Sequence, residues 1–263
     1  MELEIRGKVA IIAASSKGLG KASALGLARE GARLTIFSRD GDAIESTARE
    51  IRDETGASVL ALSADVTNES QLEEVVERTA REYSTVHILV NNAGGPPFGS
   101  FEDFPPQAWQ KAIELNLLST INLTRLVVPF MKSQGWGRIV NITSIAVKQP
   151  LDGLILSNTA RAGVIGFAKS LSNELARFGI TVNNVCPGRI LTDRILHLAQ
   201  ERARVTGTSV EDVFRHWEEE IPSGRLGTPR ELADLVVFLS SERASYITGA
   251  TIQVDGGAVK SLF

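Results

Sequence analysis

The chain has 263 residues, an apolar content of 43% and a formal net charge of −3, values that suit a folded globular protein of one domain or two. This composition excludes disordered and fibrous proteins. With 28 basic against 31 acidic residues, the chain also lacks the positive charge that nucleic-acid binding requires. Cys186 is the single cysteine, which excludes an internal disulfide and a cysteine-rich metal site.

No run of residues is long and apolar enough to cross a membrane. Residues 1–7 are charged and lack the apolar stretch of a signal peptide. We therefore expect a cytoplasmic protein.

Short apolar runs alternate with amphipathic segments along the whole chain. The apolar runs predict seven strands, at residues 9–13, 34–37, 58–62, 88–90, 138–142, 181–185 and 251–254. Helical periodicity predicts helices at residues 20–30, 42–55, 71–83, 107–132, 158–178 and 229–239. This alternation predicts one α/β domain over residues 1–263: a doubly wound Rossmann fold whose sheet is mostly parallel, with helices on both faces. Ligands of such a sheet bind at the carboxyl ends of the strands.

The segment 191–227 stands apart because it is polar and helix-forming, at residues 194–204 and 209–219. We expect it to form a helical lid over the substrate, with a surface helix pair of no function as the alternative. The loop at residues 95–98, with Phe214 and Trp217, offers apolar surface to this lid. That surface hints at a ligand with an apolar part.

A glycine-containing turn follows the first predicted strand and leads into a helix. Glycines let the backbone approach a pyrophosphate, and the amino terminus of a helix favours an anion. A tight strand-to-helix turn needs glycine anyway, so a purely structural turn is the alternative. The predicted cofactor contacts in this turn are Ser15, Ser16, Lys17, Gly18 and Leu19.

The second predicted strand ends at Ser38 and Arg39, where a dinucleotide fold places the adenosine ribose. An acidic residue here selects NAD, whereas an arginine accommodates the 2′-phosphate of NADP. Arg39 and the nearby Lys17 therefore favour NADP over NAD, unless both are merely solvated loop charges.

Further motifs follow in chain order: Asp65 and Val66, Asn91 to Gly94, Asn116, Asn141 to Ser144, Pro187 to Thr192, Tyr246 to Gly249, and Val254 to Gly257. Their order and spacing resemble those of the short-chain dehydrogenase/reductase family over essentially the whole chain. The resemblance is strongest to its 3-oxoacyl-carrier-protein reductase-like members, and it implies an oxidoreductase that acts on a small carbonyl or alcohol substrate.

The resemblance also implies roles for single residues. Asp65 and Val66 would hold the adenine, Asn92, Ala93 and Gly94 would line the adenosine and ribose, and Pro187, Gly188, Ile190 and Thr192 would contact the nicotinamide half. Asn116 would support a proton-relay water, and Ser144 would bind the substrate oxygen. The helices that hold Asn116 and residues 157–178 would join copies into a homodimer or homotetramer.

The catalytic pair of the family is replaced in this chain. The family has a tyrosine thirteen residues after the serine and a lysine four residues later, and these positions hold Ser157 and Arg161 here. A serine hydroxyl is a far weaker acid than a phenol, whose pKa of about 10 a neighbouring cation can lower. Arg161 stays protonated and cannot shuttle a proton. Spacing of four still places both residues on one helical face, where they can bind an oxygen or an anion.

Other residues are candidates for the missing proton donor. We expect the only two tyrosines, Tyr83 and Tyr246, to lie away from the site. Lys148 and Asp152 belong to the loop before Ser157, and His197 and His216 to the predicted lid. A solvated surface charge is the alternative for each of these four.

The phosphate turn also departs from the family, which has Thr-Gly where this chain has Ala13 and Ala14. Ala14 is tolerable if its φ is negative. Three hypotheses therefore stay open: an NADP-linked oxidoreductase with an unusual proton donor, a cofactor-binding protein without turnover, and a non-redox lyase of the halohydrin-dehalogenase kind.

Overall fold

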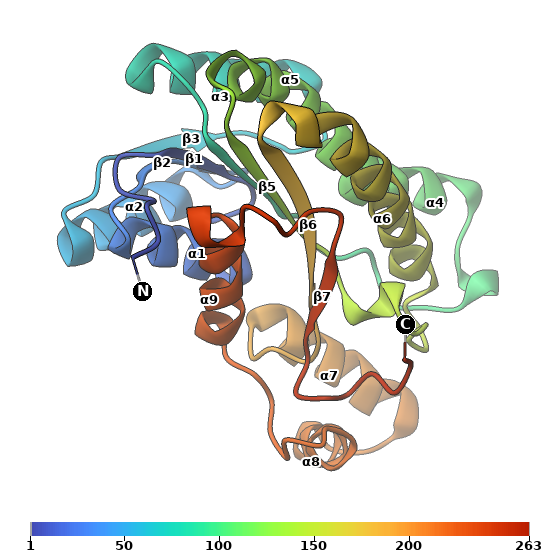
Figure 1. Cartoon of the computed structure of the whole chain (residues 1–263). Helices are drawn as coiled ribbons and strands as arrows, with labels where there is room; N and C mark the ends of the chain where they lie inside the picture. The colour runs from blue at the N-terminus through green and yellow to red at the C-terminus, as the bar shows by residue number, and fades with distance from the viewer. Residues whose placement is uncertain (1, 263) are drawn as a thin grey trace.

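A parallel sheet of seven strands forms the centre of the computed structural model, which describes residues 2–262 (Figure 1). The strands are β1 (Val9–Ile12), β2 (Arg33–Ser38), β3 (Val59–Ser63), β4 (Ile88–Asn91), β5 (Gly137–Ile142), β6 (Ile180–Pro187) and β7 (Thr251–Val254). Their order is β3-β2-β1-β4-β5-β6-β7, and every neighbouring pair is parallel. The winding reverses between β1 and β4, which is where doubly wound sheets bind ligands. The predicted Rossmann fold is confirmed.

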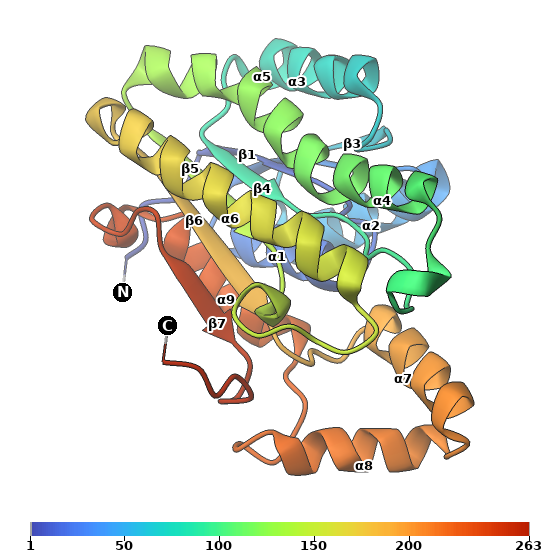
Figure 2. The same cartoon turned by 90° about the vertical axis from the view of Figure 1, so that its right-hand side faces the viewer.

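Helices cover both faces of the sheet (Figures 1 and 2). One face carries α1 (Gly18–Arg29), α2 (Gly41–Thr55) and α9 (Pro229–Leu239), and the other carries α3 (Glu69–Tyr83), α5 (Ser119–Gln134) and α6 (Ile155–Leu175). Short helical turns lie at η1 (Phe101–Asp103), η3 (Ile145–Val147), η4 (Ala176–Phe178) and η5 (Glu242–Ala244). None of the helices in residues 2–262 is long and apolar enough to span a membrane.

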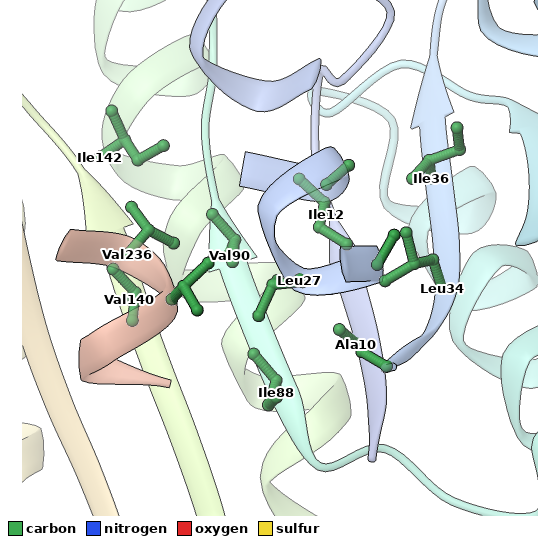
Figure 3. Packing of buried hydrophobic residues seen from close by; sticks show 14 of the residues in the cluster. Ala10, Ile12, Leu27, Leu34, Ile36, Ile88, Val90, Val140, Ile142 and Val236 are labelled. Carbon is green, nitrogen blue, oxygen red and sulfur yellow. The ribbon is translucent and has the colours of Figure 1, made fainter. Parts of the chain in front are cut away.

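Figure 3 shows how the first face is packed. Leu27 of α1 and Val236 of α9 lie over the strand side chains Ala10, Ile12 and Val90, and all five are fully buried. The alternating residue Ile11 faces the second core, on the other side of the sheet. Because both faces are buried, the strands are mostly apolar, which is the pattern that made them predictable.

The predicted helix at residues 107–132 is interrupted, contrary to expectation. It consists of α4 (Pro106–Ile113), a π-helical segment η2 (Glu114–Leu118) and then α5. A π-helical turn inserts one extra residue per turn, and such turns are frequent at functional sites. Asn116 lies in this segment and is buried.

Two helices, α7 (Asp193–Thr206) and α8 (Val210–Glu220), project from the body of the molecule (Figure 2). The Leu191 amide donates to the Gly227 carbonyl at 2.8 Å, which closes the base of this helix pair. The two helices predicted for the segment 191–227 are therefore present within it. Of the predicted domain limits, residues 1 and 263 lie outside the described part of the chain.

Candidate functional site

A row of asparagines joins three neighbouring strands, β4, β5 and β6, near their carboxyl ends. Asn91 on β4 donates through Nδ2 to Asn141 Oδ1 on β5 at 2.9 Å, and Asn141 donates in the same way to Asn184 on β6, also at 2.9 Å. The three residues share one register position across the sheet. Because buried amides need partners, this row holds in place the strand ends from which the site loops leave.

The turn after β1 has a strained residue. Ala14 has a φ of +47°, in the left-handed region that disfavours side chains. An alanine is expected to be tolerable at position 14 only with a negative φ, and the φ is positive. Asn92 Nδ2 donates to the Ala14 carbonyl at 3.1 Å, and a Cβ at Gly20 would lie 2.5 Å from that same carbonyl oxygen. Close packing on both sides holds Ala14 in its strained conformation.

The neighbouring serines stabilise the turn and the end of β2. Ser15 is fully buried, and its hydroxyl donates to the Ile12 carbonyl at 2.9 Å. The Ser16 carbonyl accepts from Thr47 of α2. Ser38 donates to the Asp40 carbonyl at 3.0 Å. The exposed Arg39 has no partner for its side chain within residues 2–262, so its charge is available to a ligand.

Lys17 lies in an ion pair that its place in the chain does not predict. Its Nζ is 3.1 Å from Asp193 Oδ2 at the start of α7, and both side chains are about three-quarters exposed. Gly18 lies beside Thr192, because a Cβ on Gly18 would be 3.7 Å from the Thr192 methyl. The turn after β1 and the loop after β6 therefore meet in front of the sheet.

The remaining predicted cofactor contacts also lie at the carboxyl edge. Asp65 Oδ1 caps the start of the next loop by accepting from the Thr67 amide at 2.9 Å. Gly188 donates its amide to the Val254 carbonyl at 2.9 Å, and the Thr192 hydroxyl caps α7. Ile190 is buried at the base of the lid against Gly227. Val66, Ala93, Gly94, Leu19 and Pro187 lie in the same set of strand-end loops or at their margins.

Arg161 joins three segments of the chain. Its Nε donates to Ser157 Oγ at 3.2 Å, and its Nη1 donates to the Ile142 and Thr143 carbonyls at 3.1 Å each. Its Nη2 donates to the Gly94 carbonyl at 3.4 Å. The expected common face of Ser157 and Arg161 is present, but most of the guanidinium is committed to carbonyl groups.

The environment of Arg161 is unfavourable for a charge. Burial first, and then the positive charge of Arg194, lower the pKa of Arg161 to about 10. A group with this pKa is still protonated at neutral pH, so the guanidinium remains a hydrogen-bond donor and an unneutralised cation. No carboxylate of the described residues pairs with it.

Asn116 lies next to Arg161 at a small cavity. Its Nδ2 donates to the Gly94 carbonyl at 2.9 Å, so Asn116 and Arg161 bind the same oxygen. Its Oδ1 is buried and has no partner within the described residues. The cavity has a volume of about 10 Å³ and is lined by Asn116, Arg161, Thr120 and the residues after β4. That size is close to the minimum for one ordered water.

Ser144 lies just after β5, and Cys186 lies near the end of β6. The Ser144 Oγ accepts from the Ala146 amide at 3.1 Å, so its hydroxyl proton is free to point toward a ligand. Cys186 Sγ lies 3.1 Å from Thr143 Oγ1. Burial raises the pKa of the Cys186 thiol, although the charges of Lys148 and Arg161 act in the opposite direction. The thiol is therefore protonated, and Lys148 lies close enough to influence it.

The other proton-donor candidates differ in position. Tyr83 binds the Leu34 carbonyl and Ser58 near the starts of β2 and β3, and Tyr246 is fully exposed. Both tyrosines lie away from the site, as expected. His216 is also exposed and pairs with Glu220 on the same helix. His197 and Asp152 are exposed as well, whereas Lys148 is only partly so.

The lid differs from expectation in its apolar residues. Trp217 is only 8% exposed and packs with Phe214, Ala199 and Val213 between α7 and α8. The Arg189 guanidinium lies over its ring at 4.8 Å. The interpretation of Trp217 as ligand-facing surface is wrong, because the two amphipathic helices bury it between themselves.

Sequence reasoning missed Arg194, which the fold brings to the loop after β4. Its Nη2, on α7, donates to the Pro96 carbonyl of that loop at 2.6 Å. A Cβ on Gly95 would lie 2.7 Å from that nitrogen, so the guanidinium rests directly on this glycine. In the sequence, Arg194 is marked only by its place two residues after the Thr192 motif. A charged residue on the surface of a helix could occupy that place equally well.

Comparisons with known proteins give a consistent result. A family model described as enoyl-(acyl carrier protein) reductase matches residues 13–259. The chain is similar to the D-beta-hydroxybutyrate dehydrogenase of Cupriavidus necator, at 37% identity over 262 residues, covering 97% of this chain and 99% of that protein. It is also 37% identical over 258 residues to the 3-oxoacyl-acyl-carrier-protein reductase FabG of Escherichia coli, covering 97% of this chain and 98% of that one.

A solved structure is similar over its whole length. The L-sorbose reductase from Gluconobacter frateurii, complexed with NADPH and L-sorbose, has a TM-score of 0.94 and 35% identity, covering 100% of both chains. Both the sequence and the backbone are thus related to reductases throughout.

Proposed function

Because the chain belongs to the short-chain dehydrogenase/reductase family, we propose that it is an NADP-linked oxidoreductase that interconverts a carbonyl and an alcohol on a small molecule. One observation carries the proposal. Arg161 and Asn116 both bind the Gly94 carbonyl, and Arg161 also reaches Ser157 and the end of β5. The loop after β4, the end of β5 and helix α6 are therefore held together by Arg161 and Asn116, without the tyrosine and lysine of the family.

The NADPH complex of the sorbose reductase supports NADP as the cofactor. In this chain Lys17 and Arg39 would hold the 2′-phosphate, the turn at residues 15–19 the pyrophosphate, and Asp65 and Val66 the adenine. The nicotinamide half would lie against the loops at residues 92–94 and 187–192. When bound, the cofactor supplies or accepts the hydride.

Two serine hydroxyls of this chain would bind the reacting oxygen, but neither replaces the missing acid. Ser144 and Ser157 carry hydroxyls that can donate to a carbonyl oxygen, and Arg161 orients Ser157. A water bound to the free Oδ1 of Asn116 would supply the proton, with Lys148 as the alternative source. Because a positioned general acid is worth about 10²–10⁴-fold in rate, we expect slow turnover.

The first test is calorimetric titration of the purified protein with NADPH and, as a control, NADH. Micromolar binding of NADPH with much weaker binding of NADH is the expected result, because only NADPH carries the 2′-phosphate. Arg39→Ala should weaken NADPH binding about tenfold and leave NADH binding unchanged, as expected for one charge-assisted contact. Absence of binding by either nucleotide would overturn the oxidoreductase assignment and favour lyase chemistry.

The second test restores the family pair in a Ser157→Tyr, Arg161→Lys double variant. If the wild-type site is limited by its proton donor, NADPH oxidation with a panel of ketones should rise by about 10²–10⁴-fold. The Ser157→Tyr single variant is the control, because it lacks the lysine. Tight NADPH binding without turnover in the wild type, and turnover only in the double variant, would instead identify a cofactor-binding protein without redox activity.

We also infer a homodimer or homotetramer that acts in the cytoplasm. Light scattering on the eluted protein tests the first part, and a monomer at micromolar concentration would contradict it.

A further inference from the structure

Positive charges gather around the reacting position without a matching acid. Arg161 and Arg194 both bind the short segment after β4, through the Gly94 and Pro96 carbonyls respectively. Within residues 2–262 neither guanidinium forms an ion pair with a carboxylate. An uncompensated pair of cations in a part-buried site is costly unless a ligand supplies the opposite charge.

Arg194 is the member of the pair that a ligand can reach. Arg161 has used its donors on Ser157 and three carbonyls, whereas Arg194 uses only one N–H, toward Pro96. Its remaining four N–H donors have no partner within the described residues. Arg194 is partly buried, and a guanidinium in this setting presents the planar fork that binds carboxylates in two-point fashion.

The position of Arg194 relative to the reacting oxygen supports a substrate role. Arg194 binds the Pro96 carbonyl, two residues after the Gly94 carbonyl that Arg161 binds, and Arg161 binds the Ser157 hydroxyl that would receive the substrate oxygen. Lys148 adds a third positive charge on the Cys186 side of the site. The acid nearest in sequence, Asp193, pairs with Lys17 instead.

We propose that the substrate is an organic anion: an oxo acid or hydroxy acid whose ionised carboxylate is bound by Arg194 while its carbonyl or hydroxyl oxygen is bound by Ser144 and Ser157. This inference rests on the proposed oxidoreductase function and specifies its substrate class. Gly95 is part of this anion site, since any side chain there would occupy the place of the Arg194 guanidinium.

The test uses matched pairs of 2-, 3- and 4-oxo acids and their uncharged primary amides, assayed by NADPH oxidation. The wild type should prefer at least one acid over its own amide by tenfold or more in kcat/KM. Arg194→Ala should lower kcat/KM for that acid by about 10–100-fold and leave the amide unchanged. Gly95→Ala should produce the same loss without altering any charge. Arg204→Ala is the control, because Arg204 is exposed on the same helix and, within residues 2–262, pairs only with Glu201.

A binding assay decides the outcome if turnover is too slow to measure. Calorimetry of the corresponding hydroxy acids and hydroxy amides is done with the protein alone and with NADP⁺ present. Equal affinity or equal kcat/KM for acid and amide would overturn the inference and leave the oxidoreductase standing. Weaker NADPH binding by Arg194→Ala, with an unchanged preference for the acid, would assign the guanidinium to the cofactor phosphates and also overturn it. Failure to bind NADPH would remove the proposed function, while a preference for the acid would still establish the anion site.

Discussion

Ala14 shows how a single residue can carry strain at a site. It stands in the left-handed region, at φ +47°, where the family has glycine. Its carbonyl accepts from Asn92, and Gly20 packs against the same oxygen, so the backbone cannot relax to a negative φ without losing both contacts. A left-handed alanine costs about 1–2 kcal/mol relative to its preferred conformation.

Ala14→Gly should therefore stabilise the protein by roughly 0.5–1 kcal/mol, after the greater entropy of glycine in the unfolded chain is subtracted. Urea unfolding followed by tryptophan fluorescence measures the free energy of unfolding. Ala13→Gly is the matched control, because Ala13 is buried and lies outside the left-handed region, so that change should destabilise. A less stable Ala14→Gly protein would show that the alanine methyl makes a packing contribution larger than its strain.

At the scale of elements, the strands are anchored by polar groups at both ends. The asparagine row fixes the carboxyl ends of β4, β5 and β6. At the amino end, the Val9 amide at the start of β1 donates to Nδ1 of His87, just before β4, at 3.0 Å. This bond requires a neutral imidazole, because a protonated ring nitrogen cannot accept.

Stability should therefore fall in acid through His87. Burial, followed by the charges of Lys8 and Arg33, lowers the pKa of His87 from 6.5 to about 4. The unfolded chain takes up this proton below pH 6.5 and the folded chain only near pH 4. The contribution is thus complete above pH 6.5 and is lost as the pH falls toward 4. Because His87 is partly exposed, we expect a loss of about 1–2 kcal/mol.

Denaturant unfolding at pH 7 and at pH 4.5 measures this loss. His87→Asn keeps an acceptor for the Val9 amide and should be less sensitive to pH across this range. His216→Gln is the control, since His216 is exposed on α8. If His87→Asn loses as much stability in acid as the wild type, other groups are responsible.

At the scale of the whole molecule, the Lys17–Asp193 pair connects the turn after β1 with the start of α7, 176 residues later in the chain. The two side chains are 75% and 76% exposed. Exposed pairs of this kind contribute about 0–1 kcal/mol, so a ligand phosphate can displace Asp193 from Lys17 at little cost. Asp193 at the start of α7 is thus held to the turn only weakly.

Asp193→Asn should consequently tighten NADPH binding by about 2–5-fold, because Lys17 is freed and a negative charge near the phosphates is removed. The effect should shrink as salt is raised and should be smaller for NADH. Calorimetry at two ionic strengths measures it, with Glu219→Gln on α8 as a control for lid charge. Weaker NADPH binding by Asp193→Asn would mean that the ion pair instead holds the lid in its binding position.

The helix and strand order could be predicted because each element carries its own periodicity, and the limits of β7 and α9 were predicted to the residue. The interruption at η2 could not be predicted, since residues 107–132 keep a helical pattern through the π-helical segment that holds the buried Asn116. For the same reason Trp217 was misassigned: its pattern shows an amphipathic helix but not which neighbour covers it.

The sequence by itself determined the parallel sheet and the place of the strand-end motifs, and it predicts that Ser157 and Arg161 stand where the family has its catalytic pair, because these depend on residue type and spacing along one chain. Only the tertiary structure decided the sign of φ at Ala14, the pairing of Lys17 with Asp193 and the binding of Arg161 and Arg194 to the nearby carbonyls of Gly94 and Pro96. Each depends on segments far apart in the chain that the sheet brings to one edge. Distances between such segments are set by packing, which periodicity along the chain does not encode.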